Sequence, residues 1–198
     1  NVSLAKRFFG KQGRWAIAID PSYISKAGKK TPHIGRFWSG CAQSVKHGLE
    51  IMGIGLIDID AKDCMMLKAH QSLSNKELSL RNKTMVDFYI SVIKRYRKEL
   101  LKLSTLIVAD AYFSTSTFVN GIKKEGFSLI SRFRDNACLF YVYAGPRTGK
   151  RGRPKTKDGK IDMKNLDLTR MEKMEMKDIE GTAYTLIDYS KALRCKNI

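Results

Sequence analysis

An amphipathic helical pattern between Thr84 and Leu103 leads directly into the apolar segment 105–111, and this junction strongly limits the folds available to the chain. Apolar residues recur along the first segment at steps of three and four, which predicts a helix with one buried face. Thr84, with Asp87 three residues later, predicts a capping box at its start. Because a helix that enters an apolar strand directly is typical of a crossover, we expect 105–111 to be a buried strand lying parallel to a neighbour.

Three strands are expected before this helix. Residues 15–20 alternate and are β-prone, and Pro21 is expected to end that strand because proline cannot donate to a sheet ladder. Residues 36–45 and 49–59 are predicted as two further strands joined by a turn at 46–48. The three strands would form a meander, whereas the polar stretch 61–83 is predicted to be irregular.

A second helix and a further strand are expected after the long helix. Residues 114–117 offer several N-caps, Gly126 is expected to end the helix, and 127–134 is predicted as a strand. This order predicts an α/β fold in which a mixed sheet is flanked by helices. From residue 137 onward the pattern changes to strand-like segments around a basic linker at 145–160. We therefore expect an α/β core at 1–136, and a basic linker with the start of a β-rich insertion at 137–198.

The charge of the chain indicates a polyanionic partner. Lys and Arg total 37 against 19 Asp and Glu among 198 residues, which gives a net charge of +18 and makes nucleic acid the leading partner class. No uninterrupted apolar run approaches the ~20 residues that cross a bilayer, and the N-terminus lacks the apolar region of a signal peptide. We expect a soluble, intracellular protein that does not engage a membrane.

The spacing of cysteine and histidine disfavours a soft-metal site. The four cysteines never form a C-x-x-C pair, and no histidine lies at metal-ligand spacing from another histidine or cysteine. Any bound metal is therefore expected to be a hard ion held by oxygen.

Two aspartates stand at the ends of predicted strands: Asp20 ends the first, and Asp110 ends the strand after the long helix. Catalytic groups collect at strand ends in open α/β sheets, and an aspartate there is costly unless it is solvated, paired or bound to a cation. Oxygen ligation selects Mg²⁺ or Mn²⁺. The spacing is equally compatible with a shared metal site and with two independent caps of a loop or helix.

The segments around these aspartates resemble the catalytic core of bacterial insertion-sequence transposases of the DDE superfamily. The resemblance rests on Ala-Ile-Asp20-Pro-Ser-Tyr-Ile-Ser-Lys-Ala-Gly-Lys-Lys and on Leu-Ile-Val-Ala-Asp110-Ala-Tyr-Phe-Ser, and it covers roughly Arg14 to Arg134. It implies an RNase H-like fold in which Asp20 and Asp110 are the first two catalytic acids and bind Mg²⁺ or Mn²⁺. It also implies cleavage of transposon ends in double-stranded DNA, strand transfer to target DNA, and a homodimer on the DNA.

The third acid of that family has no counterpart in this sequence. In the family it is a Glu on a later helix, within a pattern of Tyr, Arg, Glu and Lys, whereas Glu172, Glu175 and Glu180 lie in a Met- and Lys-rich stretch without that pattern. The sequence therefore predicts an incomplete active site. Because the chain begins with Asn1 rather than Met, we expect a fragment of a longer protein.

Two basic stretches contain candidate DNA ligands. Residues 150–155 (Lys-Arg-Gly-Arg-Pro-Lys) resemble the core of an AT-hook, whose extended backbone lies in the minor groove with its arginines in the negative potential there. A solvated basic loop that contacts phosphates without base preference is the alternative. The candidate DNA-binding residues are Arg147, Lys150, Arg151, Arg153 and Lys155 in and beside this stretch, and Lys26, Lys29 and Lys30 after Asp20.

Taken with the resemblance, these features predict a DDE-type DNA transposase in the bacterial cytoplasm, associated with the nucleoid. Tyr112 and Phe113 would either stack on a flipped base or pack under the following helix. Two other functions are open: a non-catalytic DNA-binding remnant of a transposase, and an RNase H-like nuclease that acts on RNA or RNA–DNA hybrids.

Overall fold

A computed structural model describes residues 2–10, 13–134, 136–146, 149, 151–152, 154–174, 183–185, 188–190 and 195–196. It divides the chain into two compact units, Asn1–Arg132 and Phe133–Ile198. Among the described residues, no helix has the length and apolar character needed to cross a membrane.

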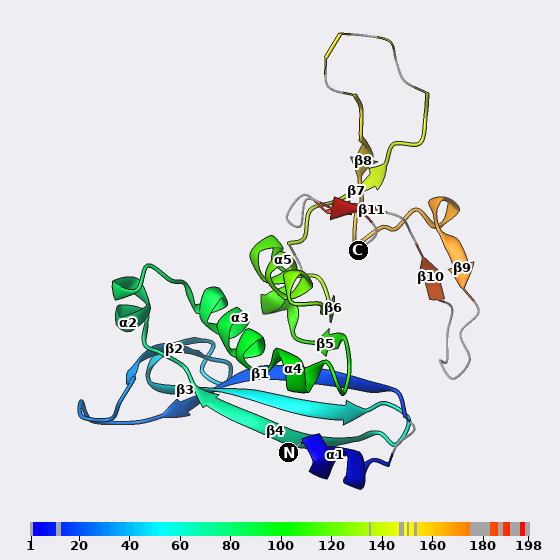
Figure 1. Ribbon diagram of the computed structural model, residues 1–198. Helices are drawn as coiled ribbons and strands as arrows, with labels where there is room; N and C mark the ends of the chain where they lie inside the picture. Colours follow the sequence, from blue (N-terminus) through cyan, green and yellow to red (C-terminus); the bar gives the residue numbers. More distant parts are fainter. Residues whose placement is uncertain are drawn as a thin grey trace. The chain divides into compact units, whose positions relative to one another are not determined.

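Unit 1 is built on a six-stranded mixed sheet (Figure 1). Its strands are β1 (Trp15–Ser25), β2 (Gly35–Ser39), β3 (Ser44–Asp58), β4 (Asp63–Gln71), β5 (Leu106–Val108) and β6 (Ser128–Ile130). The order is β2-β3-β1-β5-β6, and β4 also pairs with β3. The pairings among β1 to β4 are antiparallel, whereas β5 lies parallel to both β1 and β6.

Helices flank this sheet (Figure 1). They are α1 (Val2–Phe8), α2 (Asn75–Leu80), α3 (Met85–Arg95), α4 (Arg97–Leu100), the 3-10 turn η1 (Ala111–Phe113) and α5 (Ser116–Lys124). The buried side chains of the central strands join those of α3, η1 and α5 in one core that includes Ile17, Ile54, Ile93, Phe113 and Phe118. The α/β, RNase H-like fold with a mixed sheet flanked by helices is therefore confirmed.

Several helix ends, and the crossover to β5, agree with the predictions from the sequence. Thr84 and Asp87 form the predicted capping box of α3, with Thr84 N–H and hydroxyl both donating to Asp87 Oδ2. The crossover strand β5 is parallel to β1, as predicted. Gly126 follows α5 with φ of +90°, a conformation that glycine adopts without the strain of a Cβ. The long helical pattern is divided at Tyr96, where α3 ends and α4 begins.

The expected end of the first strand at Pro21 is wrong. β1 continues to Ser25, and Pro21 lies opposite Met52 of β3. On its other side, β1 pairs with β5 only at Ile17 and Ala18, so Pro21 lies where that edge is open and a missing N–H is tolerated. The turn predicted at 46–48 is also wrong, because those residues lie inside β3 and residues 40–43 connect it to β2.

The prediction of an irregular stretch at 61–83 is wrong for two elements. β4 has only one buried side chain, Leu67, so its sequence pattern does not indicate a strand. It forms a strand because it pairs with the apolar strand β3. Helix α2 begins at a capping box between Ser74 and Glu77. That pattern of a serine followed three residues later by glutamate was visible in the sequence.

Unit 2 contains short strands around a small core. They are β7 (Leu139–Val142), β8 (Lys157–Lys160), β9 (Glu172–Met174), β10 (Ala183–Thr185), β11 (Asp188–Ser190) and β12 (Cys195–Lys196), with a 3-10 turn η2 (Leu168–Arg170). One sheet has the order β12-β11-β7-β8, and β9 pairs with β10. Leu139, Tyr141 and Ile161 form the core. Strand β8 occupies the end of the stretch that we predicted as a linker, so that stretch is not wholly irregular.

Candidate active site

Asp20 and Asp110 each lie two residues beyond the last pair of the parallel β1–β5 ladder, Asp20 within β1 and Asp110 after the end of β5 at Val108. Ile17 pairs with Ile107 and Ala18 with Val108, a constant difference of 90 in residue number. The same difference relates Asp20 to Asp110, two residues beyond the last pair. Neighbouring strands lie about 4.8 Å apart at such a ladder, and Pro21, the residue after Asp20, lines one pocket together with Asp110.

Asp20 extends from the middle of β1, and its side chain is exposed. It lies opposite Gly53 of β3, which has no side chain beside the carboxylate. Alternation places Asp20 on the same face as Ala16 and Ala18, so its neighbours along β1 on that face are small. Ser22 Oγ donates a hydrogen bond to Asp20 Oδ2 at 3.2 Å and helps to orient it.

Asp110 is also exposed and serves as the N-cap of η1. Its Oδ1 accepts a hydrogen bond from the Tyr112 N–H at 3.0 Å, and its backbone carbonyl accepts one from Ser131 Oγ at 2.8 Å. The capping interpretation is thus correct for Asp110. The cap uses Oδ1 only and fixes the direction of the carboxylate, which leaves Oδ2 for a further ligand.

The donor chemistry of this pair fits a hard divalent cation. Mg²⁺ is commonly held by one or two carboxylates, and water or substrate phosphate oxygens complete its coordination. Within the described residues, no three acidic, histidine or cysteine side chains are grouped as a larger metal cluster. Of the glutamates considered as a third acid, Glu172 is exposed on β9, whereas Glu175 and Glu180 lie outside the described residues.

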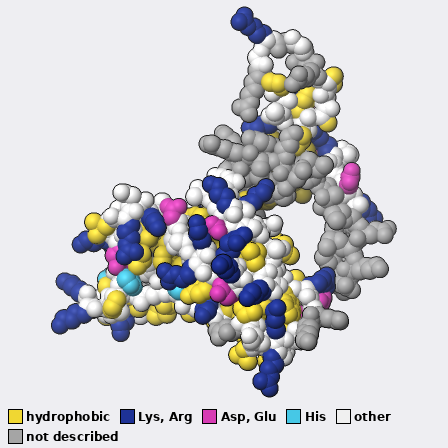
Figure 2. All heavy atoms as spheres, viewed as in Figure 1, with side chains coloured by type: hydrophobic (Ala, Val, Ile, Leu, Met, Phe, Trp, Pro, Cys, Tyr) yellow, Lys and Arg dark blue, Asp and Glu magenta, His cyan; other side chains and the backbone are white. Residues whose placement is uncertain are grey.

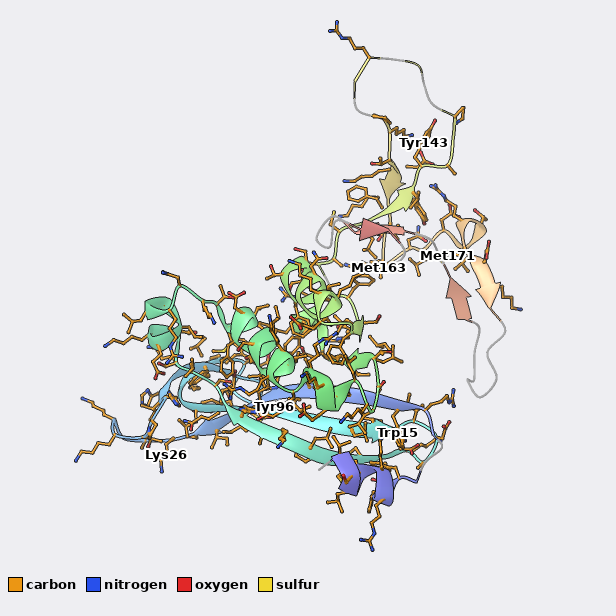
Figure 3. The ribbon with its side chains drawn as sticks, viewed as in Figure 1. Trp15, Lys26, Tyr96, Tyr143, Met163 and Met171 are labelled. Carbon is orange, nitrogen blue, oxygen red and sulfur yellow. The ribbon has the colours of Figure 1, made fainter. Side chains whose placement is uncertain are left out.

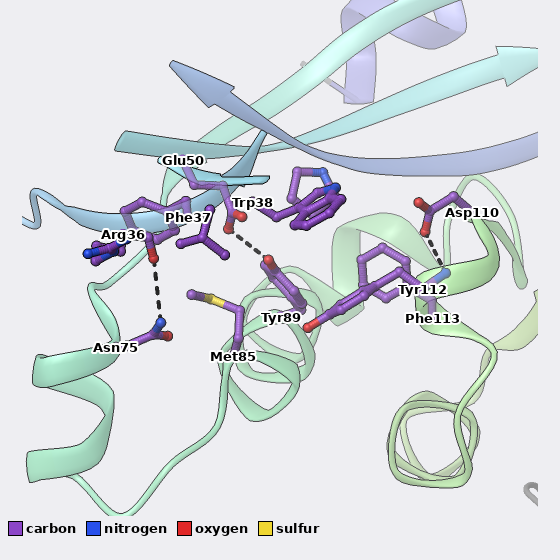
Figure 4. A pocket seen from close by; sticks show the side chains of 12 residues that line it. Arg36, Phe37, Trp38, Glu50, Asn75, Met85, Tyr89, Asp110, Tyr112 and Phe113 are labelled. Atoms are coloured by element: carbon purple, nitrogen blue, oxygen red, sulfur yellow. Dashed lines mark hydrogen bonds between the residues drawn. The ribbon is translucent and has the colours of Figure 1, made fainter. Parts of the chain in front are cut away.

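A pocket of about 500 Å³ adjoins Asp110 (Figure 4). Most of its wall is aromatic or apolar, and includes Phe37, Trp38, Met85, Tyr89, Tyr112 and Phe113. These residues come from β2, α3 and η1. Phe113 is buried against Phe118, with ring centroids 4.7 Å apart, so it packs under the following helix; Tyr112 remains 45% exposed at the pocket.

Glu50 on β3 is a buried acid in this pocket that sequence reasoning missed. Its side chain is only 8% exposed, and the Tyr89 hydroxyl donates to Glu50 Oε1 at 2.7 Å. Burial, and then the charge of Glu50, raise the pKa of Tyr89, which therefore stays protonated and remains a donor. The sequence did indicate this position, because Glu50, Met52 and Ile54 are alternate residues along β3 and therefore point to the same buried face of the strand.

The lysines after Asp20 lie on an exposed loop. Lys26, Lys29 and Lys30 are all exposed, and Figure 3 shows Lys26 pointing away from the sheet. Figure 2 shows Lys and Arg side chains over much of the visible face of unit 1. The loop contacts β3, because His47 Nε2 lies within hydrogen-bonding distance, 3.2 Å, of the Gly28 carbonyl oxygen.

The other two histidines, like His47, also have partners. His70 Nε2 lies 2.9 Å from the Tyr96 hydroxyl, and His33 Nδ1 lies 2.7 Å from Glu77 Oε1. None of these contacts involves the aspartate pair.

The second basic stretch is only partly described. Arg147, Lys150 and Arg153 lie outside the described residues, whereas Arg151 is exposed. Lys155 forms an ion pair with Asp158 at 2.8 Å, and its ammonium lies 4.4 Å from the centre of the Tyr143 ring. Lys155 is therefore held within unit 2 by its own neighbours.

The mixed sheet flanked by helices is of the RNase H-like fold class. Residues 3–192 match the family described as DDE superfamily endonuclease, and because this covers most of the chain, the protein belongs to that family. No curated protein and no solved structure matches the chain. The resemblance to the DDE superfamily drawn from the sequence is thereby confirmed.

Proposed function

We propose that this protein is a DDE-type DNA transposase of the bacterial insertion-sequence kind, in which Asp20 and Asp110 bind Mg²⁺ or Mn²⁺. The observation that carries the proposal is that both aspartates lie two residues beyond the last pair of the β1–β5 ladder, in a chain of the DDE superfamily endonuclease family. Such ions activate an attacking oxygen and stabilise the leaving oxygen in phosphoryl transfer. The carboxylates hold and orient the ions, and the Tyr112 N–H fixes Asp110 for that role.

The substrates in this proposal are double-stranded transposon ends and target DNA, bound by a homodimer in the cytoplasm at the nucleoid. The net charge of +18 favours a polyanion. Lys26, Lys29 and Lys30 would guide DNA toward Asp20, and the basic residues of 147–155 would bind it elsewhere. In domain terms, residues 1–136 are the first part of the catalytic core, and 137–198 form the basic, β-rich insertion.

The proposal is tested with Asp20→Asn and Asp110→Asn, which remove one metal-binding charge each without changing side-chain volume. Both variants should bind duplex DNA as the wild type does and should lose Mg²⁺- or Mn²⁺-dependent plasmid nicking by at least about a hundredfold. Asp63→Asn is the matched control, because Asp63 is an exposed aspartate at the start of β4. Nicking at the wild-type rate by either variant would contradict the assignment.

A non-catalytic DNA-binding function is the second candidate, because no third acid of the family is assigned in this chain. Its signature would be DNA binding by the wild type without cleavage and without Mn²⁺ binding at Asp20 and Asp110. Including an RNA–DNA hybrid among the substrates distinguishes a transposase from a nuclease that acts on hybrids.

A further inference from the structure

The pocket beside Asp110 contains aromatic surface that core packing does not explain. Phe37, Tyr89 and Phe113 are each at most 4% exposed and belong to the packed interior. Trp38 on β2 and Tyr112 on η1 are different, because they line the same pocket while 57% and 45% exposed. Figure 4 shows Trp38, Tyr89 and Tyr112 around one space, contributed by three separate elements. Flat rings at the rim of a pocket suit a flat ligand that stacks.

Glu50 gives this pocket a specific polar requirement. Its carboxylate is buried on β3 and accepts a hydrogen bond from the Tyr89 hydroxyl at Oε1. An ionised carboxylate only accepts hydrogen bonds and has room for several donors, and one hydroxyl supplies one. A ligand that enters this pocket must therefore present N–H or O–H groups toward Glu50 and an apolar face to the rings.

The position of the pocket limits which ligand this is. Asp110 is one of its lining residues, so the ligand would lie directly beside the proposed metal site. In an endonuclease of this family with a charge of +18, the molecule brought to that place is a DNA strand. A nucleobase has a flat face for the rings and, in guanine, cytosine and adenine, amino hydrogens for a carboxylate.

The geometry points to a nucleobase site: a base displaced from the DNA enters this pocket, stacks against Trp38 and Tyr112, and donates hydrogen bonds to Glu50. This inference rests on the proposed function, because it requires DNA at Asp110. Guanine suits the site best, since its N1–H and N2–H groups lie side by side as two oxygens of a carboxylate do. Thymine is disfavoured, because carbonyl oxygens flank its single N–H and would face the Glu50 charge.

The test compares binding of the full chain to short DNA duplexes of one sequence, either fully paired or with a single extrahelical guanine or thymine. Wild-type protein should bind the guanine-bulged duplex about tenfold more tightly than the paired one, as expected for one stacked base. Trp38→Ala should remove that gain and leave binding to the paired duplex unchanged. Phe8→Ala is the control, because Phe8 is a similarly exposed aromatic residue of α1 that does not line the pocket.

Glu50→Gln tests the specificity separately from the stacking. The amide of the substituted side chain still accepts a hydrogen bond from the Tyr89 hydroxyl but adds an N–H donor, so the preference for guanine over thymine should shrink or reverse. A 2-aminopurine in place of the extrahelical base provides a measurement on unmodified protein: stacking in the pocket should quench its fluorescence.

The outcomes separate this inference from the proposed function. Equal affinity for paired and bulged duplexes, or equal losses in the Trp38 and Phe8 variants, would overturn the base site and leave the transposase proposal standing. Failure to bind any of the duplexes would overturn both.

Discussion

Ile17 of β1 pairs in parallel register with Ile107 of β5, and Asp20 and Asp110 each follow one member of this pair by three residues. In the proposed function both carboxylates bind a divalent cation, and an ion that binds only the native state stabilises that state. The proposed metal site can therefore be tested by measurements of stability as well as of cleavage.

Divalent ions should stabilise the wild-type fold through this pair. Binding to the native state alone adds about 2.7 kcal/mol when the ion is at a hundred times its dissociation constant. We expect Mn²⁺ to raise Tm for the wild type and for Asp63→Asn, but not for Asp20→Asn. Differential scanning calorimetry measures these shifts in Tm, and a full Mn²⁺ response in Asp20→Asn would contradict the shared site.

Removing the Tyr89 hydroxyl should destabilise unit 1. Tyr89 is 2% exposed and donates to the buried Glu50 carboxylate, so Tyr89→Phe leaves a buried charge without that donor. The cost should be about 1.5–3 kcal/mol in the free energy of unfolding, measured by urea denaturation. Tyr96→Phe removes a hydroxyl from a half-buried tyrosine and should cost less. Equal losses would mean that the charge of Glu50 contributes nothing.

The contact between α3 and α5 depends on a glycine. A Cβ added to Gly121 would lie 2.4 Å from Ile90 Cδ1 and 3.0 Å from Ile90 Cγ1, so the Ile90 side chain would have to move. Gly121→Ala should therefore destabilise the fold by about 1–3 kcal/mol although alanine is the better helix former. Ile90→Val removes the Cδ1 atom and should restore much of that loss. A double-mutant cycle in urea without such coupling would refute the packing argument.

Acid should weaken the start of α2. The hydrogen bond from the Ser74 hydroxyl is the main cause that lowers the pKa of Glu77 from 4.5 to about 2. Because the folded pKa is below the unfolded one, the unfolded state binds more protons between these values, and stability falls as pH falls. The contribution should be complete above pH 4.5 and lost near pH 2. Urea midpoints across this range should fall less steeply in Ser74→Ala than in the wild type; identical slopes would argue against the cap.

The parts of the fold that the sequence predicted have local causes. The capping box at Thr84 and the end of α5 at Gly126 depend on neighbouring residues, and the crossover to β5 was indicated by a helix that leads directly into an apolar segment. The errors concern pairing between distant residues. β1 passes through Pro21 because β3 continues beside it, and the polar β4 is a strand because β3 offers it an edge.

The same distinction applies to the candidate site. Asp20 and Asp110 were found because each follows an apolar run, and in the sheet both lie just beyond the pairs that join β1 to β5. The pocket was not found, because Trp38, Glu50 and Tyr89 meet only after β2, β3 and α3 pack. Nothing in the sequence indicates that residues this far apart form one site, because only the folded arrangement of the strands and helices brings them together.

Lys26, Lys29 and Lys30 should contribute specifically to DNA affinity if the loop after β1 contacts phosphates. Each phosphate contact adds about 0.9 to the slope of log affinity against log salt, so replacing all three lysines with alanine should reduce the slope by roughly 1 to 3. Lys98, Lys102 and Lys123 provide a control of equal charge, because they are exposed on or beside α4 and α5. Replacing these three lysines with alanine should weaken the long-range attraction to DNA without removing phosphate contacts. The slope of log affinity against log salt should therefore stay nearly unchanged. Fluorescence anisotropy over a series of salt concentrations measures both slopes. Equal reductions in the two triple variants would show that the lysines act only through net charge, and that the loop after Asp20 does not guide DNA to the aspartates.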